Sequence, residues 1–131
     1  MNNKIKVMIT GALALISSSV MAVQPILTYE FQVEPGKATE FAEAFDALQN
    51  SKLGQDRTAQ VQLQSISFNG ASPSTHSIVV LYPSMTEMDK WTAKNANSKE
   101  GAAFRAVASK ISKPVAQYIS VPMKSWGTVS S

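Results

Sequence analysis

Few side chains in this sequence are of the types that carry out chemistry, and the one histidine, His76, is the first to consider. An imidazole changes its charge near neutral pH, so His76 could act as a general base or bind a metal at the edge of a pocket. The sequence supplies no partner for it, because no His, Asp and Glu residues share a metal-ligand spacing and cysteine is absent. We therefore favour the alternative that His76 is a water-contacting residue at the start of a strand. No metal site and no catalytic set are predicted.

A second candidate site is an apolar pocket built from aromatic and methionine side chains. Met88, Trp91 and Phe104 follow helical spacing in the second half of the chain, and Phe45 and Tyr29 belong to a helix and a strand in the first half. Such a set could line a site for a small apolar or aromatic ligand. Such a stripe is more often the core face of the helices, packed on the sheet. The predicted pocket residues are Trp91, Phe104, Met88, Phe45, Tyr29 and His76, and no cofactor is expected.

Paired carboxylates are a third candidate, because they can carry out acid–base catalysis when a cleft holds them close together. The sequence does not indicate such a cleft. Glu40, Glu43 and Asp46 lie mainly off the apolar stripe of their helix, so we expect a solvated face. The chain also lacks a Gly-rich phosphate loop, a serine nucleophile elbow and a Cys–His pair.

The elements that position these residues follow from hydrophobic periodicity. Residues 26–33 alternate as a half-buried strand, and a helical period replaces the alternation from residue 37 to residue 48. Two further strands are expected over 59–69 and 77–82, the latter so apolar that we expect cover on both of its faces. A second helix begins after Ser84 and is interrupted at 95–98, and a last strand covers 115–123.

The helix ends carry their own signals. Ser84 and Glu87 form a capping-box pattern, Ser98 is placed to cap the continuation of the second helix, and Pro114 is expected to stop it. The resulting order is strand, helix, strand, strand, helix, strand. It predicts an α+β, ferredoxin-like βαββαβ fold with a four-stranded antiparallel sheet and both helices on one face.

Residues 1–22 have the features of a secretory signal peptide. Lys4 and Lys6 precede the short apolar run 7–16, and Val20-Met21-Ala22 has the small residues of a cleavage site. Removing 22 of the 131 residues leaves 109, enough for a single domain over 23–131. We expect a bacterial periplasmic or secreted protein.

Composition excludes several classes of protein. Loss of Lys4 and Lys6 lowers the net charge from +3 to +1, and no basic stripe remains to bind nucleic acid. The absence of cysteine excludes a disulfide scaffold and a lipoprotein. No second hydrophobic run follows, so stable membrane insertion is not expected after cleavage.

The chain resembles the dimeric α+β barrel superfamily, and within it the proteins related to antibiotic-biosynthesis monooxygenases. The matching features lie within residues 26–123 and are Phe31-x-Val33-x-Pro35-Gly36, Phe41 and Phe45 in the following helix, Tyr82-Pro83, Trp91, and Phe104-Arg105. The resemblance implies a homodimer whose sheets pack face to face and a cavity between helices and sheet in each subunit.

Two activities occur in such families, and this sequence lacks residues that one of them requires. Some members oxidise polycyclic aromatic substrates with O₂ and no cofactor. Others degrade haem with a helical Trp, a His ligand about ten residues later and an Asn on the first strand. Here Trp91 is followed by Gly101, and residues 26–33 contain no Asn. Haem degradation is therefore not expected.

A polar sheet face would form the dimer interface that the resemblance implies. Gln60, Gln62 and Gln64 share one side of their strand, and we expect Ile66 and Phe68 to supply an apolar centre. Three functions remain open. The first is an exported protein that is non-catalytic or binds a small apolar or aromatic ligand. The others are a cofactor-independent monooxygenase-like enzyme, acting on an aromatic or quinone-type substrate, and a structural or interaction module of the cell envelope.

Overall fold

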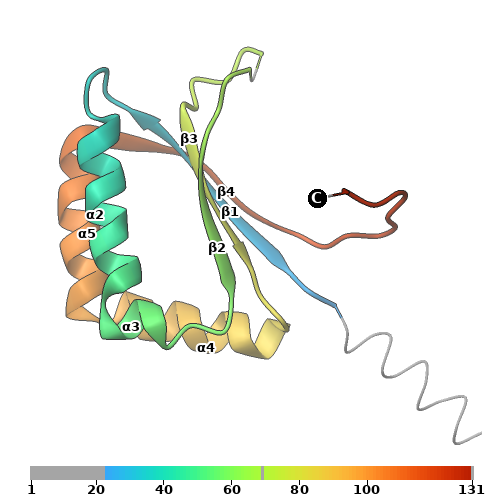
Figure 1. Ribbon diagram of the computed structural model, residues 1–131. Coiled ribbons are helices and arrows are strands. Elements are labelled where there is room, and N and C mark those ends of the chain that lie inside the picture. The colour runs from blue at the N-terminus through green and yellow to red at the C-terminus, as the bar shows by residue number, and fades with distance from the viewer. Residues whose placement is uncertain (1–22, 69, 131) are drawn as a thin grey trace, which may run out of the picture.

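The computed structural model describes residues 23–68 and 70–130, so the leader predicted for residues 1–22 lies outside the described range. Eight elements follow one another along the chain (Figure 1). They are β1 (Ile26–Val33), α2 (Ala38–Asn50), α3 (Lys52–Gln55), β2 (Gln60–Ser65), β3 (His76–Leu81), α4 (Met85–Ala96), α5 (Lys99–Ile111) and β4 (Ser112–Ser120).

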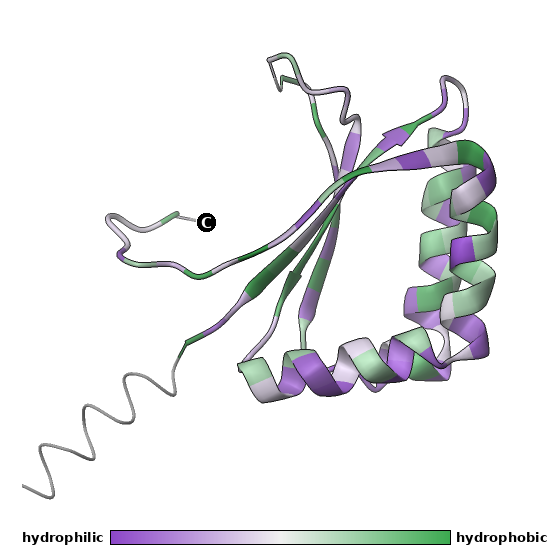
Figure 2. Ribbon diagram, turned by 180° about the vertical axis from the view of Figure 1, so that it is seen from behind, coloured by the Kyte–Doolittle hydropathy of each residue, from purple (hydrophilic) through white to green (hydrophobic). Residues whose placement is uncertain are grey.

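The four strands form one antiparallel sheet in the order β2-β3-β1-β4. Its helices lie on a single face, with α2 and α5 side by side and α4 running across their ends, as both views show (Figures 1 and 2). This arrangement confirms the α+β, ferredoxin-like prediction. The opposite face of the sheet carries no helix of the described residues.

Alternation along β1 decides which side chains meet the helices. Leu27 and Val33 are buried in the core, and Tyr29 and Phe31 on the same face pack against it. Phe41 of α2, only 1 % exposed, lies at the centre of this core. Its ring centroid is 5.3 Å from that of Phe31 and 5.6 Å from that of Phe104, in the tilted and edge-on geometries that aromatic pairs prefer.

Serine side chains begin three of the helices. Ser84 Oγ accepts a hydrogen bond from the Glu87 backbone N–H at 3.1 Å, and Ser98 Oγ accepts one from the Gly101 N–H at 2.9 Å. Both predicted caps are thereby confirmed. Ser51 caps the short helix α3 in the same way, through the Gly54 N–H. The sequence analysis missed this helix because it has only one turn and lies in a polar stretch.

The strand boundaries correct three expectations. β2 ends at Ser65, so Ile66 and Phe68 lie in the connection to β3, where Phe68 is 95 % exposed. They do not form the centre of a sheet face. β4 begins at Ser112, directly after α5, so Pro114 does not stop the helix but lies within the strand. Pro114 is tolerated there because β4 is an edge strand and its register with β1 shifts at a bulge.

The sheet face opposite the helices, called the open face below, has polar edges and an apolar middle. Register places on it the residues Thr28, Glu30, Gln60, Gln62, Gln64, Ser77, Val79, Leu81 and Tyr118. β3 is an inner strand as predicted, but only one of its faces is covered by helices, which corrects the expected cover on both. The Gln64 amide donates a hydrogen bond to Gln62 at 3.0 Å and accepts one from the Ser77 hydroxyl at 3.2 Å. These bonds fix the side chains on this part of the open face.

Candidate functional site

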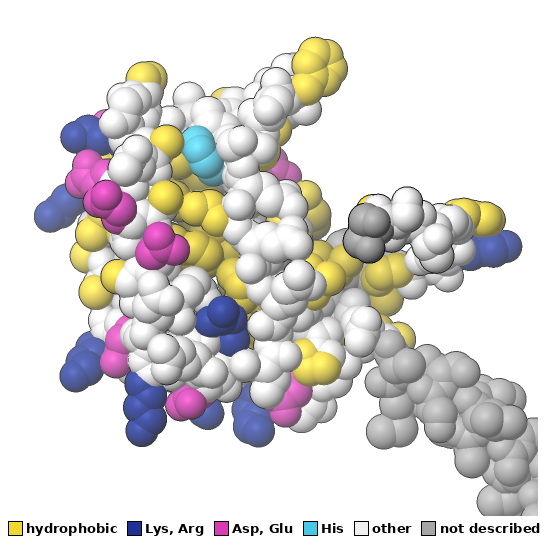
Figure 3. All heavy atoms as spheres, viewed as in Figure 1, with side chains coloured by type: hydrophobic (Ala, Val, Ile, Leu, Met, Phe, Trp, Pro, Cys, Tyr) yellow, Lys and Arg dark blue, Asp and Glu magenta, His cyan; other side chains and the backbone are white. Residues whose placement is uncertain are grey.

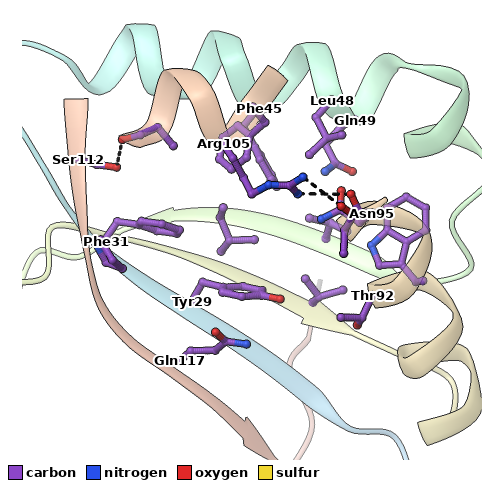
Figure 4. Close-up of a pocket in the computed structure, with 18 of the residues that line it drawn as sticks. Tyr29, Phe31, Phe45, Leu48, Gln49, Thr92, Asn95, Arg105, Ser112 and Gln117 are labelled. Atoms are coloured by element: carbon purple, nitrogen blue, oxygen red, sulfur yellow. Dashed lines mark hydrogen bonds between the residues drawn. The ribbon is translucent and has the colours of Figure 1, made fainter. Parts of the chain in front are cut away.

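A cavity of about 470 Å³ lies between the helices and the sheet. Apolar side chains line the hollow between α2 and β2 on the face seen in Figure 3, and the cavity wall is drawn in Figure 4. Its apolar and aromatic lining comes from every strand and from the helices α2, α4 and α5. A volume of this size is that of a pocket for a small organic molecule.

Three aromatic side chains form the helix wall of the cavity. Phe45 comes from α2, Trp91 from α4 and Phe104 from α5. Phe45 and Phe104 contact each other at 5.4 Å between centroids, which fixes both rings. Trp91 is one helical turn beyond the buried Met88, so its indole comes from the sheet-facing side of α4.

The sheet wall, made by Tyr29, Tyr82 and Gln117, presents polar atoms beneath these rings. Tyr29 and Gln117 are directly opposite each other in the β1–β4 register, so their side chains share one face (Figure 4). Burial raises the pKa of Tyr29 above its ordinary value. Burial also raises the pKa of Tyr82 to about 12, while its interaction with the Thr92 hydroxyl acts in the opposite direction. Both phenols are therefore neutral hydrogen-bonding groups at physiological pH.

The corner where α4 meets α5 is the polar end of the cavity. Arg105 donates to the backbone carbonyls of Asn95 and Ala96, each at 3.3 Å, and so binds the C-terminal end of α4 (Figure 4). The amide oxygens Gln49 Oε1 and Asn95 Oδ1 are buried without a hydrogen-bond partner in the described structure. A donor entering the cavity reaches them only if these amides rotate, since both oxygens are covered.

The structure separates the six predicted pocket residues into two groups. Trp91, Phe104, Phe45 and Tyr29 line the cavity. Met88 does not line the cavity and is buried within the core instead. His76 is also outside the lining: its Nδ1 is 2.8 Å from Thr75 Oγ1 and its ring packs 6.3 Å from Phe41.

Sequence reasoning missed most of the polar lining. Tyr82, Asn95 and Gln117 were not predicted, nor were Gln49 and Arg105. The position of Gln117 was readable from the alternation of its strand, which places it beside Tyr29 once the register is known. The sequence indicates Asn95 only as part of a helix interruption. Its place beside the cavity depends on the contact between α4 and α5, which no local sequence pattern predicts.

The cavity lining is mainly apolar and nearly uncharged. Among the residues that line the cavity none is a carboxylate or an imidazole, and Arg105 is the one charged side chain. Within residues 23–68 and 70–130 no cluster of three His, Asp or Glu side chains could hold a metal ion. None of the helices in this same part of the chain is long and apolar enough to span a membrane.

Gly101 shows why a histidine does not occupy the tenth position after Trp91. A Cβ atom there would lie 2.3 Å from the Asn95 carbonyl oxygen and 2.9 Å from Ser98 Oγ. These distances are too short for any side chain, so the corner between α4 and α5 requires glycine. A histidine in place of Gly101 would therefore require this corner to change shape.

Comparison with known proteins gives the fold. No family model matches the chain, and no curated protein matches its sequence. Among solved structures, an uncharacterized NIPSNAP domain protein from Burkholderia xenovorans has a TM-score of 0.58 at 13% identity, with 81% of this chain and 99% of that chain covered. A candidate antibiotic biosynthesis monooxygenase from Nitrosomonas europaea has a TM-score of 0.56 at 11% identity, covering 81% and 95%.

A second candidate antibiotic biosynthesis monooxygenase, from Caulobacter crescentus, has a TM-score of 0.52 at 16% identity, covering 81% of this chain and 93% of that chain. The neighbours thus include the proteins that the sequence resembles. At these identities the likeness establishes the fold that the chain shares with them.

Proposed function

We propose that this protein binds a small apolar or aromatic molecule in the cavity between its helices and its sheet. The observation that carries the proposal is an unfilled volume of about 470 Å³ between the aromatic helix wall and the polar sheet wall. A flat ring placed there contacts Phe45, Trp91 and Phe104 on one side. Its polar substituents meet the neutral phenols of Tyr29 and Tyr82 on the other.

The alternatives fit the cavity less well. A purely structural module would be more stable if side chains filled the cavity, because an unfilled cavity lowers the free energy of unfolding. A cofactor-independent monooxygenase is the second candidate, favoured by the two structural neighbours that are candidate antibiotic biosynthesis monooxygenases. Such an enzyme must activate its substrate, and the lining offers no carboxylate or imidazole as a base. Binding is therefore the simpler function.

The binding proposal is tested with the fluorescent probe 1-anilinonaphthalene-8-sulfonate. Trp91→Ala removes the largest ring of the helix wall, and we expect about tenfold weaker binding of the probe. Ala96→Trp fills the cavity from the end of α4 and is expected to abolish binding. Phe68→Ala is the control, because this ring is exposed and is not among the residues that line the cavity. Unchanged affinity in both cavity variants would contradict the proposal.

We also propose that the protein is a homodimer whose open faces pack together. Support comes from the sheet itself, which has helices on one face only and presents Val79 and Leu81, half-buried, in the middle of the other. The glutamines around them supply the polar rim of an ordinary interface. Light scattering tests this proposal, and a mass equal to one chain at high concentration would contradict it.

Export to the periplasm or the medium completes the proposed function. Its support is the sequence of residues 1–22, with two lysines, a short apolar run and a small-residue cleavage site. A binding protein at that location would meet its ligand outside the cytoplasm.

A further inference from the structure

The cavity between the helices and the sheet carries its charge at one corner, where α4 meets α5. Arg105 is the one charged side chain of the lining. The ion pairs of the described residues, Lys37–Glu40 and Lys90–Glu87, do not include it. A guanidinium therefore lies at the edge of an apolar cavity without a carboxylate of the described chain to pair with it. A bound anion would complete this corner.

Arg105 keeps hydrogen-bonding capacity after it has bound the end of α4. Its Nη1 donates to the Asn95 backbone carbonyl and its Nη2 to that of Ala96, each at 3.3 Å. A guanidinium has five N–H donors, so these two bonds leave three for another acceptor. The two bonds also hold the planar group in place, which reduces the entropy lost when an acceptor binds to it.

The side-chain amide of Asn95 adds a donor to the same corner. Its Oδ1 is buried and directed at α5, because a Cβ atom at Gly101 would lie 2.7 Å from it. The amide nitrogen is at the other end of the group and is the polar atom left for the cavity. Asn95 follows Trp91 by one helical turn, so the two side chains share one side of α4. Figure 4 shows Asn95 beside the Arg105 guanidinium.

The hydroxyl groups of the lining do not offer an anion the same contacts. Thr92, Ser109 and Ser112 each donate to a backbone carbonyl three or four residues earlier in the chain. Their oxygen atoms are then available only as acceptors, which an anion does not bind. Positive charge and N–H donors therefore occur together only at the corner between α4 and α5.

This corner is also a place where solvent reaches the cavity. Ala96 and Arg105 line the cavity and are exposed, whereas Phe45 of the aromatic wall is buried. A ligand with a ring at one end and a charge at the other fits this gradient. Its ring displaces water from the apolar interior, and its charged end keeps part of its hydration.

We propose that the ligand of this cavity is an aromatic carboxylic acid, whose carboxylate binds Arg105 and the Asn95 amide while its ring lies against Trp91. This inference rests on the proposed binding function and adds the charge of the ligand. It predicts that the cavity discriminates between a carboxylate and a neutral group of the same shape.

Titration calorimetry with 2-naphthoate and 2-naphthamide tests this prediction, because the two probes share a ring system and a shape and differ in charge. We expect the unmodified protein to bind 2-naphthoate about tenfold more tightly than 2-naphthamide. Equal affinities would overturn the inference about charge and leave the binding function standing. Binding of neither probe would overturn both.

The ratio of the two affinities is also the measurement for the variants, since a general change in the cavity alters both affinities alike. Arg105→Gln should bring the ratio close to one. Asn95→Asp should lower it as well, because it keeps the backbone carbonyls that bind Arg105 and adds a negative charge beside the probe. This second variant carries the test if Arg105→Gln does not fold.

Lys110→Gln is the matched control. It removes one positive charge from an exposed position of α5 that does not line the cavity, so the ratio should stay at its original value. A ratio that is unchanged in Arg105→Gln, or that falls as far in Lys110→Gln, would show that Arg105 does not hold the carboxylate and would overturn the proposal.

Discussion

Tyr82 is the residue whose ionisation most directly reports the integrity of the cavity. It is 2 % exposed, and its pKa of about 12 is above the value near 10 of an unfolded chain. The unfolded state therefore loses its proton first as the pH rises. Stability should be fully present below pH 10 and fall progressively between about 10 and 12.

This alkaline loss can be measured by urea unfolding at a series of pH values. Tyr82→Phe has no phenol to ionise, so its stability should fall less steeply over the same window. The absorbance of tyrosinate in the intact protein should include a titration step near pH 12 that is missing from Tyr82→Phe. An identical alkaline slope in both proteins would show that the Tyr82 hydroxyl is not shielded as the structure indicates.

At this same scale, sequence reasoning found the aromatic lining and missed the polar lining. The rings of Phe45, Trp91 and Phe104 belong to apolar helix faces, and such faces are visible in a sequence as a period. Whether a ring lies beside a cavity or inside the core is decided by packing with distant segments. This is why Met88 and Trp91, one turn apart on the same stripe, have different surroundings.

Among the elements, the junction of α4 and α5 depends most on a single position. Gly101→Ala would place a Cβ 2.3 Å from the Asn95 carbonyl oxygen, so one of the two helices must move. We expect a loss of about 2 kcal/mol in the free energy of unfolding and a lower affinity for a ligand that binds at that corner. Chemical denaturation measures the first effect and probe binding the second.

The control for Gly101 lies in the same turn of α5. Ala103 is exposed, and Ala103→Ser should change stability by no more than about 0.5 kcal/mol. If Gly101→Ala were as well tolerated as this control, the close approach of the two helices would not be a constraint on the sequence.

The elements themselves were largely predictable, and their ends were not. The bounds of β1 agree with the alternation of residues 26–33, because one half-buried face imposes a period of two. Proline was misleading at residue 114: it usually ends a helix, yet α5 had already ended at Ile111 and the proline lies at a bulge of an edge strand. Only the position of β4 in the sheet, which is not a local property, makes that proline acceptable.

At the scale of the whole molecule, cleavage of the predicted leader can be tested by the mass of the exported protein. If residues 1–22 are removed on export, the protein recovered from the periplasm or the medium begins at Val23. Intact-mass measurement identifies that terminus, and Ala22→Arg, which spoils the small residue at the cleavage site, should leave a longer product in the membrane fraction. A full-length chain recovered from the cytoplasm would contradict the export proposal.

The direct passage of α5 into β4 has a consequence for how the chain can change in length. Ile111 ends the helix and Ser112 begins the strand, with no residue between them. One inserted residue would turn each later side chain of β4 to the other side of the sheet, moving Gln117 to the open face and Tyr118 to the face that carries the helices. Homologous chains should therefore vary in length in the loop between β2 and β3, and they should keep a fixed spacing from Phe104 to Gln117.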